Sequence, residues 1–506
     1  MTRPHTKLVC TIGPASVERA RELVDAGMSV ARVNFSHGTP DEQRAAFHAV
    51  RAAAHHARRS VAVMVDLPGP KIRLEDLPNG ELELEVGQRF ALRTNRPSLA
   101  QEVQPGDRLL LADGAVELVV LAPTENESAD QSDVTGHQSD QPTDEPAATD
   151  QPEPAAEQPA EEAPEQPAEQ PTDQAIPTEV VRGGLIRSRA GVNVPIERLP
   201  SVGLTDQDRQ AVPRALELRA DVIAQSFVRS ADDVRALRAL LPRPGPLLLA
   251  KIETRLAVER FDEILAEVDG VMVARGDLGV DMPYEQVPLV QKDLVRRAHA
   301  RGRFTIVATQ MLESMTSARR PTRAEASDVA NAVLDGADAV MLSAETAIGQ
   351  FPVDAARTML SICAATEQGS PAGLLERQRA ASATDDQEAV CRAAVSLADE
   401  HPTVGAIWCF TRTGRTAEIL SLLRPSDPIV AFTLSATAAR RVAARRGVVP
   451  VVLAAPKARA PLVDQMRAAA NAQGLLSDGG QTVVLVTTSS QPGGINRLEL
   501  HRVEAA

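Results

Sequence analysis

One stretch of the chain combines two apolar runs with charged residues that stand only at their ends. The first run leads into Lys251 and Glu253, and the second leads into Arg275 and Asp277. A helix-period segment separates them, so the pattern predicts strand, helix and strand. In parallel α/β folds the carboxyl ends of strands are where ligands bind. Two carboxylates suit Mg2+, and an ammonium beside them suits charge that develops on a phosphoryl group or an enolate. An ordinary solvated salt bridge is the alternative interpretation.

Polar groups follow nearly every apolar run that has the length of a strand. Eight such runs alternate with helix-period segments, which predicts an α/β fold of the (β/α)8 TIM-barrel type, with these groups facing one cavity. A doubly wound open sheet is the alternative, with less support because the strand count is eight. The groups at the strand ends are Thr11, Asn34 with Ser36, Asp66, Ser226, Lys251 with Glu253, Arg275 with Asp277, Thr309 with Gln310, and Ser343 with Glu345.

The hydrophobic period changes twice along the chain, which predicts three domains. Residues 1–73 and 183–358 form the expected barrel, and residues 74–182 alternate as an inserted antiparallel β cap, a small β-barrel. Within the cap, the segment at about 123–177 consists mostly of Pro, Ala, Glu and Gln and is predicted to be disordered. Residues 375–506 contain four further strand-like runs and form a C-terminal α/β domain.

The net charge of −14 is mostly local. Sixteen of the 68 acidic residues lie between Thr124 and Glu179, where there is no Lys or Arg; elsewhere 54 basic residues face 52 acidic ones. Aromatic residues make up 2% of the chain, which argues against a nucleic-acid partner. No apolar run is long enough to span a membrane. Four cysteines without paired or metal-ligand spacing, and a start without a signal-peptide core, predict a reduced cytoplasmic protein.

Lysine is rare in this chain, which makes its positions informative. Only five of the 54 basic residues are lysine: Lys7, Lys71, Lys251, Lys292 and Lys457. A compact ammonium is chemically different from a planar guanidinium. Two of the five lie at the predicted site, at positions 71 and 251.

Several long motifs, in order, resemble those of pyruvate kinases. They are residues 6–16 (TKLVCTIGPAS), 31–38 (ARVNFSHG), 250–253 (AKIE), 272–279 (MVARGDLG), 308–312 (ATQML) and 320–331 (RPTRAEASDVAN). The resemblance covers essentially the whole chain except the acidic segment. It implies transfer of the phosphoryl group of phosphoenolpyruvate to ADP, giving pyruvate and ATP, as in the last step of glycolysis.

The resemblance also implies a role for each site residue. Glu253 and Asp277 would hold Mg2+, and Lys251 would stabilise charge on the phosphoryl group and the enolate oxygen. The amides of Gly276 and Asp277, with Thr309, would receive the substrate carboxylate. Closure of the cap would exclude water. The remaining roles are phosphate and nucleotide contact for Arg32, Arg73, Asn34 and His37, and a proton relay for Ser343 and Glu345.

Two positions depart from the family pattern. Many members bind K+ through groups that resemble Asn34, Ser36 and Asp66, with a Glu where this chain has Lys71. We expect the Lys71 ammonium to replace the monovalent cation, so that K+ is not required. Ala190 stands where the family usually shows a basic residue, which leaves Arg189 as the cap's candidate for nucleotide contact.

A hydroxyl-rich loop in the last domain is the candidate site for a phosphorylated effector. Hydroxyls and amides at a helix start can hold phosphate, and the family uses a similar loop; a capped turn without a ligand is the alternative. The loop residues are Thr411, Arg412, Thr413, Gly414, Arg415 and Thr416. The resemblance also implies a homotetramer.

Two other functions remain open from the sequence. A different Mg2+-dependent barrel enzyme, such as a C–C lyase acting on pyruvate or phosphoenolpyruvate, would explain the carboxylates but not the cap or the arginines. A non-catalytic scaffold protein would make the acidic segment the working part, but the site residues at positions 251, 253, 277 and 309 are all present. Dependence on ADP discriminates the kinase from the lyase.

Overall fold

A computed structural model describes residues 4–112, 114–122, 175–194, 203–369, 385–454, 461–476, 480–487 and 496–504. The chain divides into two compact units. One comprises Met1–Lys71 and Pro195–Ala506, and the other is Ile72–Val194. The predicted disordered segment at about 123–177 lies outside the described residues except for its last three positions.

Eight parallel strands form the closed barrel of the larger unit. Their order around the barrel is β1-β16-β15-β14-β13-β12-β3-β2. The predicted (β/α)8 barrel is therefore confirmed, and the open doubly wound sheet is excluded. The strands are β1 (Lys7–Thr11), β2 (Val30–Asn34), β3 (Ala62–Asp66), β12 (Val222–Gln225), β13 (Leu247–Ile252), β14 (Gly270–Ala274), β15 (Phe304–Ala308) and β16 (Ala339–Leu342).

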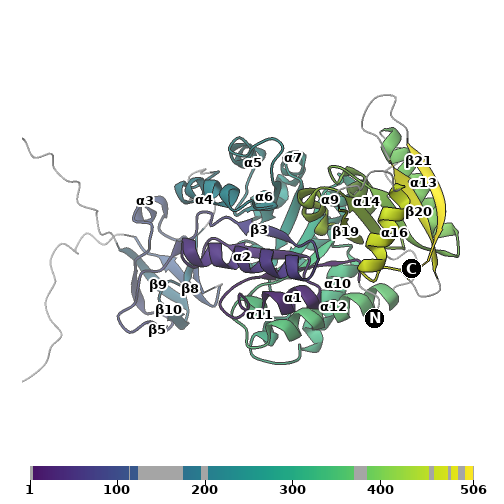
Figure 1. Cartoon of the computed structure of the whole chain (residues 1–506). Coiled ribbons are helices and arrows are strands. Elements are labelled where there is room, and N and C mark those ends of the chain that lie inside the picture. Colours follow the sequence, from purple (N-terminus) through teal and green to yellow (C-terminus); the bar gives the residue numbers. More distant parts are fainter. Residues whose placement is uncertain are drawn as a thin grey trace, which may run out of the picture. The chain divides into compact units, whose positions relative to one another are not determined.

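Helices surround the barrel, and hydroxyl residues fix where four of them begin. In each case the hydroxyl accepts a hydrogen bond from the amide of the third helical residue, and the carboxylate of that third residue accepts one from the amide of the hydroxyl residue. The four hydroxyl residues are Thr39, Thr205, Ser230 and Thr322. These capping boxes satisfy donors that a helix start leaves free. Figure 1 shows α1 and α12 side by side along the barrel. The helices are α1 (Ala20–Ala26), α2 (Pro40–His56), α4 (Asp206–Glu217), α5 (Ala231–Arg238), α6 (Arg255–Glu259), α7 (Phe261–Glu267), α8 (Arg275–Asp281), α9 (Val287–Ala300), α10 (Arg323–Leu334), α11 (Ala344–Ala347) and α12 (Pro352–Gly369).

Each barrel strand is buried on both faces, because alternate residues point into the barrel and towards the helices. On β13, Leu248 packs in the outer layer under the helices, whereas Leu247 and Leu249 pack inside. The inner layer also contains Ala443 and Ala444, which come from the C-terminal domain. That domain therefore supplies part of the barrel's interior packing.

The C-terminal domain is a five-stranded sheet with the order β19-β18-β17-β20-β21. Its last strand, β21 (Arg497–Val503), pairs antiparallel with β20 (Gln481–Thr487), and both are yellow in Figure 1. The sequence reading missed β21, because its polar residues hide a strand pattern. The other elements are β17 (Val404–Phe410), β18 (Ile429–Thr433), β19 (Val448–Val452), α13 (Asp386–Glu400), α14 (Arg415–Leu422), α15 (Ala436–Ala443) and α16 (Leu462–Ala472).

The inserted unit is antiparallel, as its alternating sequence predicts. Six strands pair in the order β4-β11-β7-β8-β9-β6, and a single bridge between Leu74 and Thr94 links residues next to the two edge strands. The structure ends this unit at Val194 rather than at 182, because β10 pairs with β5 and β11 pairs with β4 and β7. Its strands are β4 (Ile72–Arg73), β5 (Glu81–Leu84), β6 (Arg89–Leu92), β7 (Arg108–Leu111), β8 (Val116–Val120), β9 (Ile176–Arg182), β10 (Gly184–Arg187) and β11 (Gly191–Asn193), with helix α3 (Leu99–Glu102).

All four cysteines are buried and none is in a disulfide. Burial raises the pKa of each thiol, so they are packed as neutral groups. Within the described ranges, no helix combines the length and the apolar character needed to cross a membrane.

Candidate active site

Lys251 lies at the centre of the charged groups at the carboxyl ends of the barrel strands. It shares the inward face of β13 with Leu247 and Leu249, since residues two apart on a strand point the same way. Its side chain is only 6% exposed, and Nζ lies 2.7 Å from Glu253 Oε1 and 3.4 Å from Asp66 Oδ1. Nζ also donates a hydrogen bond to Ser226 Oγ at 2.9 Å. The ammonium is therefore fixed between two carboxylates, of which the sequence predicted Glu253 but offered Asp277 rather than Asp66 as the second.

A second cation, the guanidinium of Arg32, contacts the other carboxylate oxygen of Asp66. Arg32 Nε and Nη2 both donate to Asp66 Oδ2, at 2.8 and 2.5 Å, and Nη1 donates to Thr11 Oγ1 at 3.0 Å. Burial alone would raise the pKa of Asp66, but Lys251 and Arg32 outweigh it and lower that pKa to about 2. Asp66 is thus a permanent anion that orients both cations. The sequence placed Arg32 at the site but gave no sign of this contact.

Burial and neighbouring charges shift the pKa of the other ionisable groups in opposite directions. Burial would lower the pKa of Lys251, but Asp66, Glu253 and Asp277 together raise it, so its ammonium stays charged. Burial, followed by the negative charge of Asp277, raises the pKa of Glu253. Burial and then Lys251 lower the pKa of Lys71, while the same three carboxylates oppose that change. The charges of these three carboxylates therefore act on Lys71 as well as on Lys251.

A strained turn presents Thr309 beside helix α8. Thr309 and Gln310 have φ values of 66° and 53°, a left-handed conformation that is rare for a β-branched residue. Arg275 Nη2 donates to the carbonyls of both residues, at 2.8 and 3.3 Å, and Arg275 also pairs with Asp328 at 2.7 Å. The amide of Gly276 donates to Thr309 Oγ1 at 2.7 Å. Arg275 therefore acts as the clamp of this turn, a role the sequence did not reveal.

Ser343 and Glu345 lie together, although their side chains do not bond to each other. Glu345 is 1% exposed and accepts the amides of Ser343 and Leu312, at 2.7 and 3.0 Å. Ser343 Oγ is buried and has no hydrogen-bond partner within the described residues. A buried hydroxyl that lacks a partner is costly unless a ligand or water uses it.

The predicted monovalent-cation groups meet at the ends of β2 and β3. Asn34 and Asp66 are register partners, and Asn34 Oδ1 accepts the amide of Ser36 at 3.0 Å. His37 follows on the surface, where its carbonyl accepts a hydrogen bond from Gln43 at 3.0 Å.

The two candidates for nucleotide contact in the inserted unit lie next to each other. Arg73 Nη1 donates to the carbonyl of Arg189 at 3.1 Å. The guanidinium of Arg189 makes two hydrogen bonds of 3.0 Å to Asp76, and both side chains are mostly exposed. Their predicted contact with nucleotide stays a prediction.

The side chains of the candidate effector loop do not all face a common site. Gly414, at φ 102°, donates its amide to Thr411 Oγ1 at 2.9 Å and begins α14. Arg412 and Thr413 are exposed, and Thr416 is buried. Arg415 instead pairs with Asp385 at 2.9 Å and with Gln387 at 3.0 Å. Its guanidinium is therefore engaged outside the loop.

Three aspartates at the opposite end of the barrel form a floor that the sequence reading missed. Asp221, Asp269 and Asp338 stand directly before β12, β14 and β16. Each accepts an amide from the neighbouring strand, at 2.8 to 2.9 Å. The sequence feature that could have revealed them is an aspartate directly before every second strand from β12 to β16. Charge at the amino ends of barrel strands serves stability.

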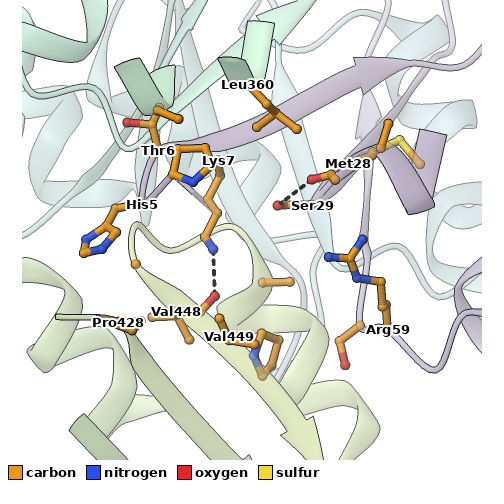
Figure 2. A pocket seen from close by; sticks show the side chains of 18 of the residues that line it. His5, Thr6, Lys7, Met28, Ser29, Arg59, Leu360, Pro428, Val448 and Val449 are labelled. Carbon is orange, nitrogen blue, oxygen red and sulfur yellow. Dashed lines mark hydrogen bonds between the residues drawn. The ribbon is translucent and has the colours of Figure 1, made fainter. Parts of the chain in front are cut away.

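The floor aspartates also bind arginines, two of which come from the C-terminal domain. Arg440 pairs with Asp221 at 2.8 Å, and Arg424 pairs with Asp338 at 3.1 Å. A cavity of about 430 Å3 lies at the same end, and Figure 2 shows Lys7 donating to the Val448 carbonyl there, at 2.7 Å. These contacts attach the C-terminal domain to the barrel.

The donor set at the mouth fits Mg2+. Glu253 and Asp277 supply carboxylate oxygens, which are the ligands this ion prefers. Among the described residues, no three His, Cys, Asp or Glu side chains group as a complete metal cage.

A closed barrel with a lysine fixed between carboxylates at its mouth defines a TIM-barrel enzyme. Comparison with known proteins narrows the class. The family "Pyruvate kinase, barrel domain" matches residues 3–143 and 167–356, and "Pyruvate kinase, alpha/beta domain" matches residues 388–501. The chain belongs to the pyruvate kinase family and is a phosphotransferase.

Individual relatives agree over nearly the whole chain. The pyruvate kinase of Geobacillus stearothermophilus is 36% identical over 518 residues, which cover 98% of this chain and 80% of the relative. The pyruvate kinase of Bacillus licheniformis is also 36% identical, over 88% of this chain and 71% of the relative. That of Staphylococcus aureus strain MRSA252 is 33% identical, over 98% of this chain and 80% of the relative.

Proposed function

We propose that this enzyme transfers the phosphoryl group of phosphoenolpyruvate to ADP, giving pyruvate and ATP, as in the last step of glycolysis. The observation that carries the proposal is the buried ammonium of Lys251, held 2.7 Å from Glu253 and 3.4 Å from Asp66. An ammonium fixed in this way meets charge developing on the phosphoryl group and on the enolate oxygen without reorganising.

The neighbouring groups have distinct tasks. The guanidinium of Arg32, oriented by Asp66, would hold the phosphoryl oxygens. The amides of Gly276 and Asp277 would receive the substrate carboxylate beside Thr309. Gly276 N–H already donates to Thr309 Oγ1, and that hydroxyl donates to the Ala308 carbonyl. Substrate binding would therefore require the hydroxyl either to release the Gly276 amide or to turn from Ala308 and donate to the carboxylate. Glu253 and Asp277 would hold Mg2+, which when bound offsets the negative charge of phosphate and carboxylate.

A proton must reach the enolate carbon after the phosphoryl group has left. Transfer breaks the bond between phosphorus and the enol oxygen and forms a bond to a terminal oxygen of ADP, which leaves the enolate of pyruvate. The buried hydroxyl of Ser343 is available as the donor, directly or through water, and Glu345 fixes it through the Ser343 amide. Arg73, Asn34, His37 and Arg189 remain the proposed nucleotide contacts.

We also propose that Lys71 makes K+ unnecessary. Its ammonium lies within the influence of Asp66, Glu253 and Asp277, and it competes with Lys251 for the same carboxylates. A covalently attached cation in this cluster can supply the charge that a bound monovalent ion would supply. Asn34 and Ser36 would then be structural neighbours of Lys71 rather than ligands of K+.

Three further properties follow from family membership and remain proposals. The enzyme would work as a cytoplasmic homotetramer, and the loop 411–416 would take a phosphorylated effector. Since Arg415 is engaged by Asp385, effector binding there would rely on the hydroxyls, on Arg412 and on the amides at the start of α14.

The test is formation of pyruvate from phosphoenolpyruvate with Mg2+, with and without ADP and with and without K+. The proposal predicts turnover that requires ADP and does not respond to K+. Pyruvate formation without ADP would favour a lyase or phosphatase. Turnover that collapses without K+ would keep the kinase and refute the role of Lys71.

A further inference from the structure

A second charged cavity, of about 330 Å3, lies away from the mouth, between the barrel and helix α15 of the C-terminal domain. The loop between α5 and β13, the end of α7, and two arginines from later in the chain line it. We call it the arginine pocket. Its charged lining residues are Arg238, Arg243, Arg303, Arg441, Glu267 and Asp269.

Both acidic residues of the arginine pocket are already neutralised. Asp269 accepts Arg238 at 3.1 Å and the amide of Leu248 at 2.8 Å. Glu267 pairs at 2.8 Å with Arg235, which is not part of the lining. Each of the two carboxylates is therefore already paired with one arginine.

The C-terminal domain contributes one cation in excess. Arg441 and Arg445 share a single carboxylate, Glu418, at 3.2 and 3.1 Å. Glu418 balances only one of the two guanidinium groups. One positive charge is left over beside the arginine pocket.

The barrel contributes two more arginines whose positive charge is not balanced by an ion pair. Arg303 donates only to carbonyls at the end of α7, at Leu265 (3.0 Å) and Ala266 (3.4 Å). These carry about half an elementary charge at most. Burial lowers the pKa of Arg303, Asp269 opposes that change, and the positive charges of Arg238 and Arg445 add to it. Arg243 is exposed between two prolines, and no carboxylate of the described ranges lies within ion-pair distance of it or of Arg303.

We propose that the arginine pocket binds a phosphoryl dianion, either free inorganic phosphate or the phosphate of a small monoester. Planar guanidinium groups match phosphate oxygens in pairs. The volume suffices for a phosphate with a small attached group. Because Arg303 and Arg441 come from the barrel and the C-terminal domain, a bound dianion would link the two. The site is separate from the mouth and from the loop 411–416.

The experiment is hydrogen–deuterium exchange of the full chain, read in peptides that cover residues 238–249 and 264–270. The probes are inorganic phosphate and glycerol 3-phosphate, each compared with chloride at equal ionic strength. We expect slower exchange in both peptides with at least one probe. The probe that acts at the lower concentration identifies free phosphate or a monoester as the preferred ligand. Protection confined to the mouth and to the loop 411–416 would overturn the proposal.

Matched variants assign the protection to the arginines. Arg243→Ala and Arg441→Ala should each raise the half-saturating phosphate concentration about tenfold, since each removes a charge-assisted contact. Arg301→Ala is the control, because Arg301 is an exposed neighbour of Arg303 that does not line the pocket. Unchanged protection in both pocket variants would also overturn the proposal. Neither Arg243 nor Arg441 belongs to the site at the mouth, so turnover reports that each variant is folded.

Discussion

The two ends of the barrel use the same side chains for opposite purposes. At the mouth, Lys251 and Arg32 share Asp66, and the buried Ser343 hydroxyl has no partner among the described residues. At the floor, Asp221 binds Arg51 and Arg440, Asp338 binds Arg424 and His299, and each aspartate accepts a strand amide. Charge that is only partly satisfied can receive a ligand, whereas fully satisfied charge holds elements together.

The largest effect should come from removing the central ammonium. Lys251→Ala should lower kcat about 100- to 1,000-fold, because one preorganised electrostatic contact is lost at the reacting atoms. Lys292→Ala is the control, since Lys292 lies on α9, where its half-exposed side chain pairs with Asp335 at the end of α10, and its loss should leave kcat unchanged. Steady-state kinetics with a melting curve for each variant would check this. A Lys251→Ala enzyme that is folded and near wild-type activity would contradict the role given to the mouth.

At the floor the same kind of change should cost stability instead of rate. Asp338→Asn leaves Arg424 buried without its counter-charge, so we expect the free energy of unfolding to fall by about 4 kcal/mol. Asp25→Asn, in an exposed pair with Arg21, should cost no more than about 0.5 kcal/mol. Denaturant titration gives both numbers. A loss of kcat in folded Asp338→Asn, at unchanged stability, would remove the contrast between the two ends.

His5, which lines the cavity at this end of the barrel, should also make stability sensitive to acid. Burial, and then Arg446, lower the pKa of His5 from 6.5 to about 4, while Glu367 opposes and Lys7 adds to the shift. Between these values the unfolded chain binds the proton and the folded chain does not, so stability falls as pH falls. From pH 6.5 to pH 5 this contributes about 2 kcal/mol.

The His5 contribution is isolated by comparison with His5→Gln. The melting temperature of the wild type should fall more steeply than that of the variant as pH is lowered from 7 to 5, whereas the two should run parallel above pH 7. Parallel curves over the whole range would show that His5 is not held neutral in the fold.

The smallest expected effect concerns Lys71 and tests whether its ammonium replaces K+ at the mouth. Lys71→Glu replaces a fixed cation by the residue that many family members carry, so its activity should become dependent on K+. We expect KCl to raise kcat about tenfold in the variant and not in the wild type. A tenfold change corresponds to about the free energy of one ionic contact. Titration with KCl at constant ionic strength, with choline chloride as the balancing salt, gives the answer. A variant that stays independent of K+ would show that Lys71 does not stand in for the ion.

The barrel and the positions of its site residues were predictable, because both follow from local periodicity. An apolar run that ends in a polar residue fixes a strand and the end at which its side chain lies, and closure of eight strands then brings the groups together. The positions of Lys251 and Glu253 could be predicted from this periodicity alone. The family motifs supplied their roles.

Contacts between distant segments were not predictable. Arg32 binds Asp66, and Arg275 clamps the turn at Thr309, through side-chain directions that no spacing in the sequence encodes. Arg415 lies in a phosphate-like loop but turns to Asp385, because a carboxylate at the start of α13 competes for it. The floor aspartates precede their strands, and a carboxylate before an apolar run does not by itself predict which strand amide it accepts.

The most direct test of the central claim follows the phosphorus atom itself. Phosphoenolpyruvate labelled with 32P is incubated with ADP, Mg2+ and the wild-type enzyme in K+-free buffer, and the label is separated by chromatography. The account predicts that the label appears in ATP in step with pyruvate, and that Lys251→Ala abolishes this transfer. Label that appears in inorganic phosphate while ADP stays unchanged would contradict phosphoryl transfer as the function of this site.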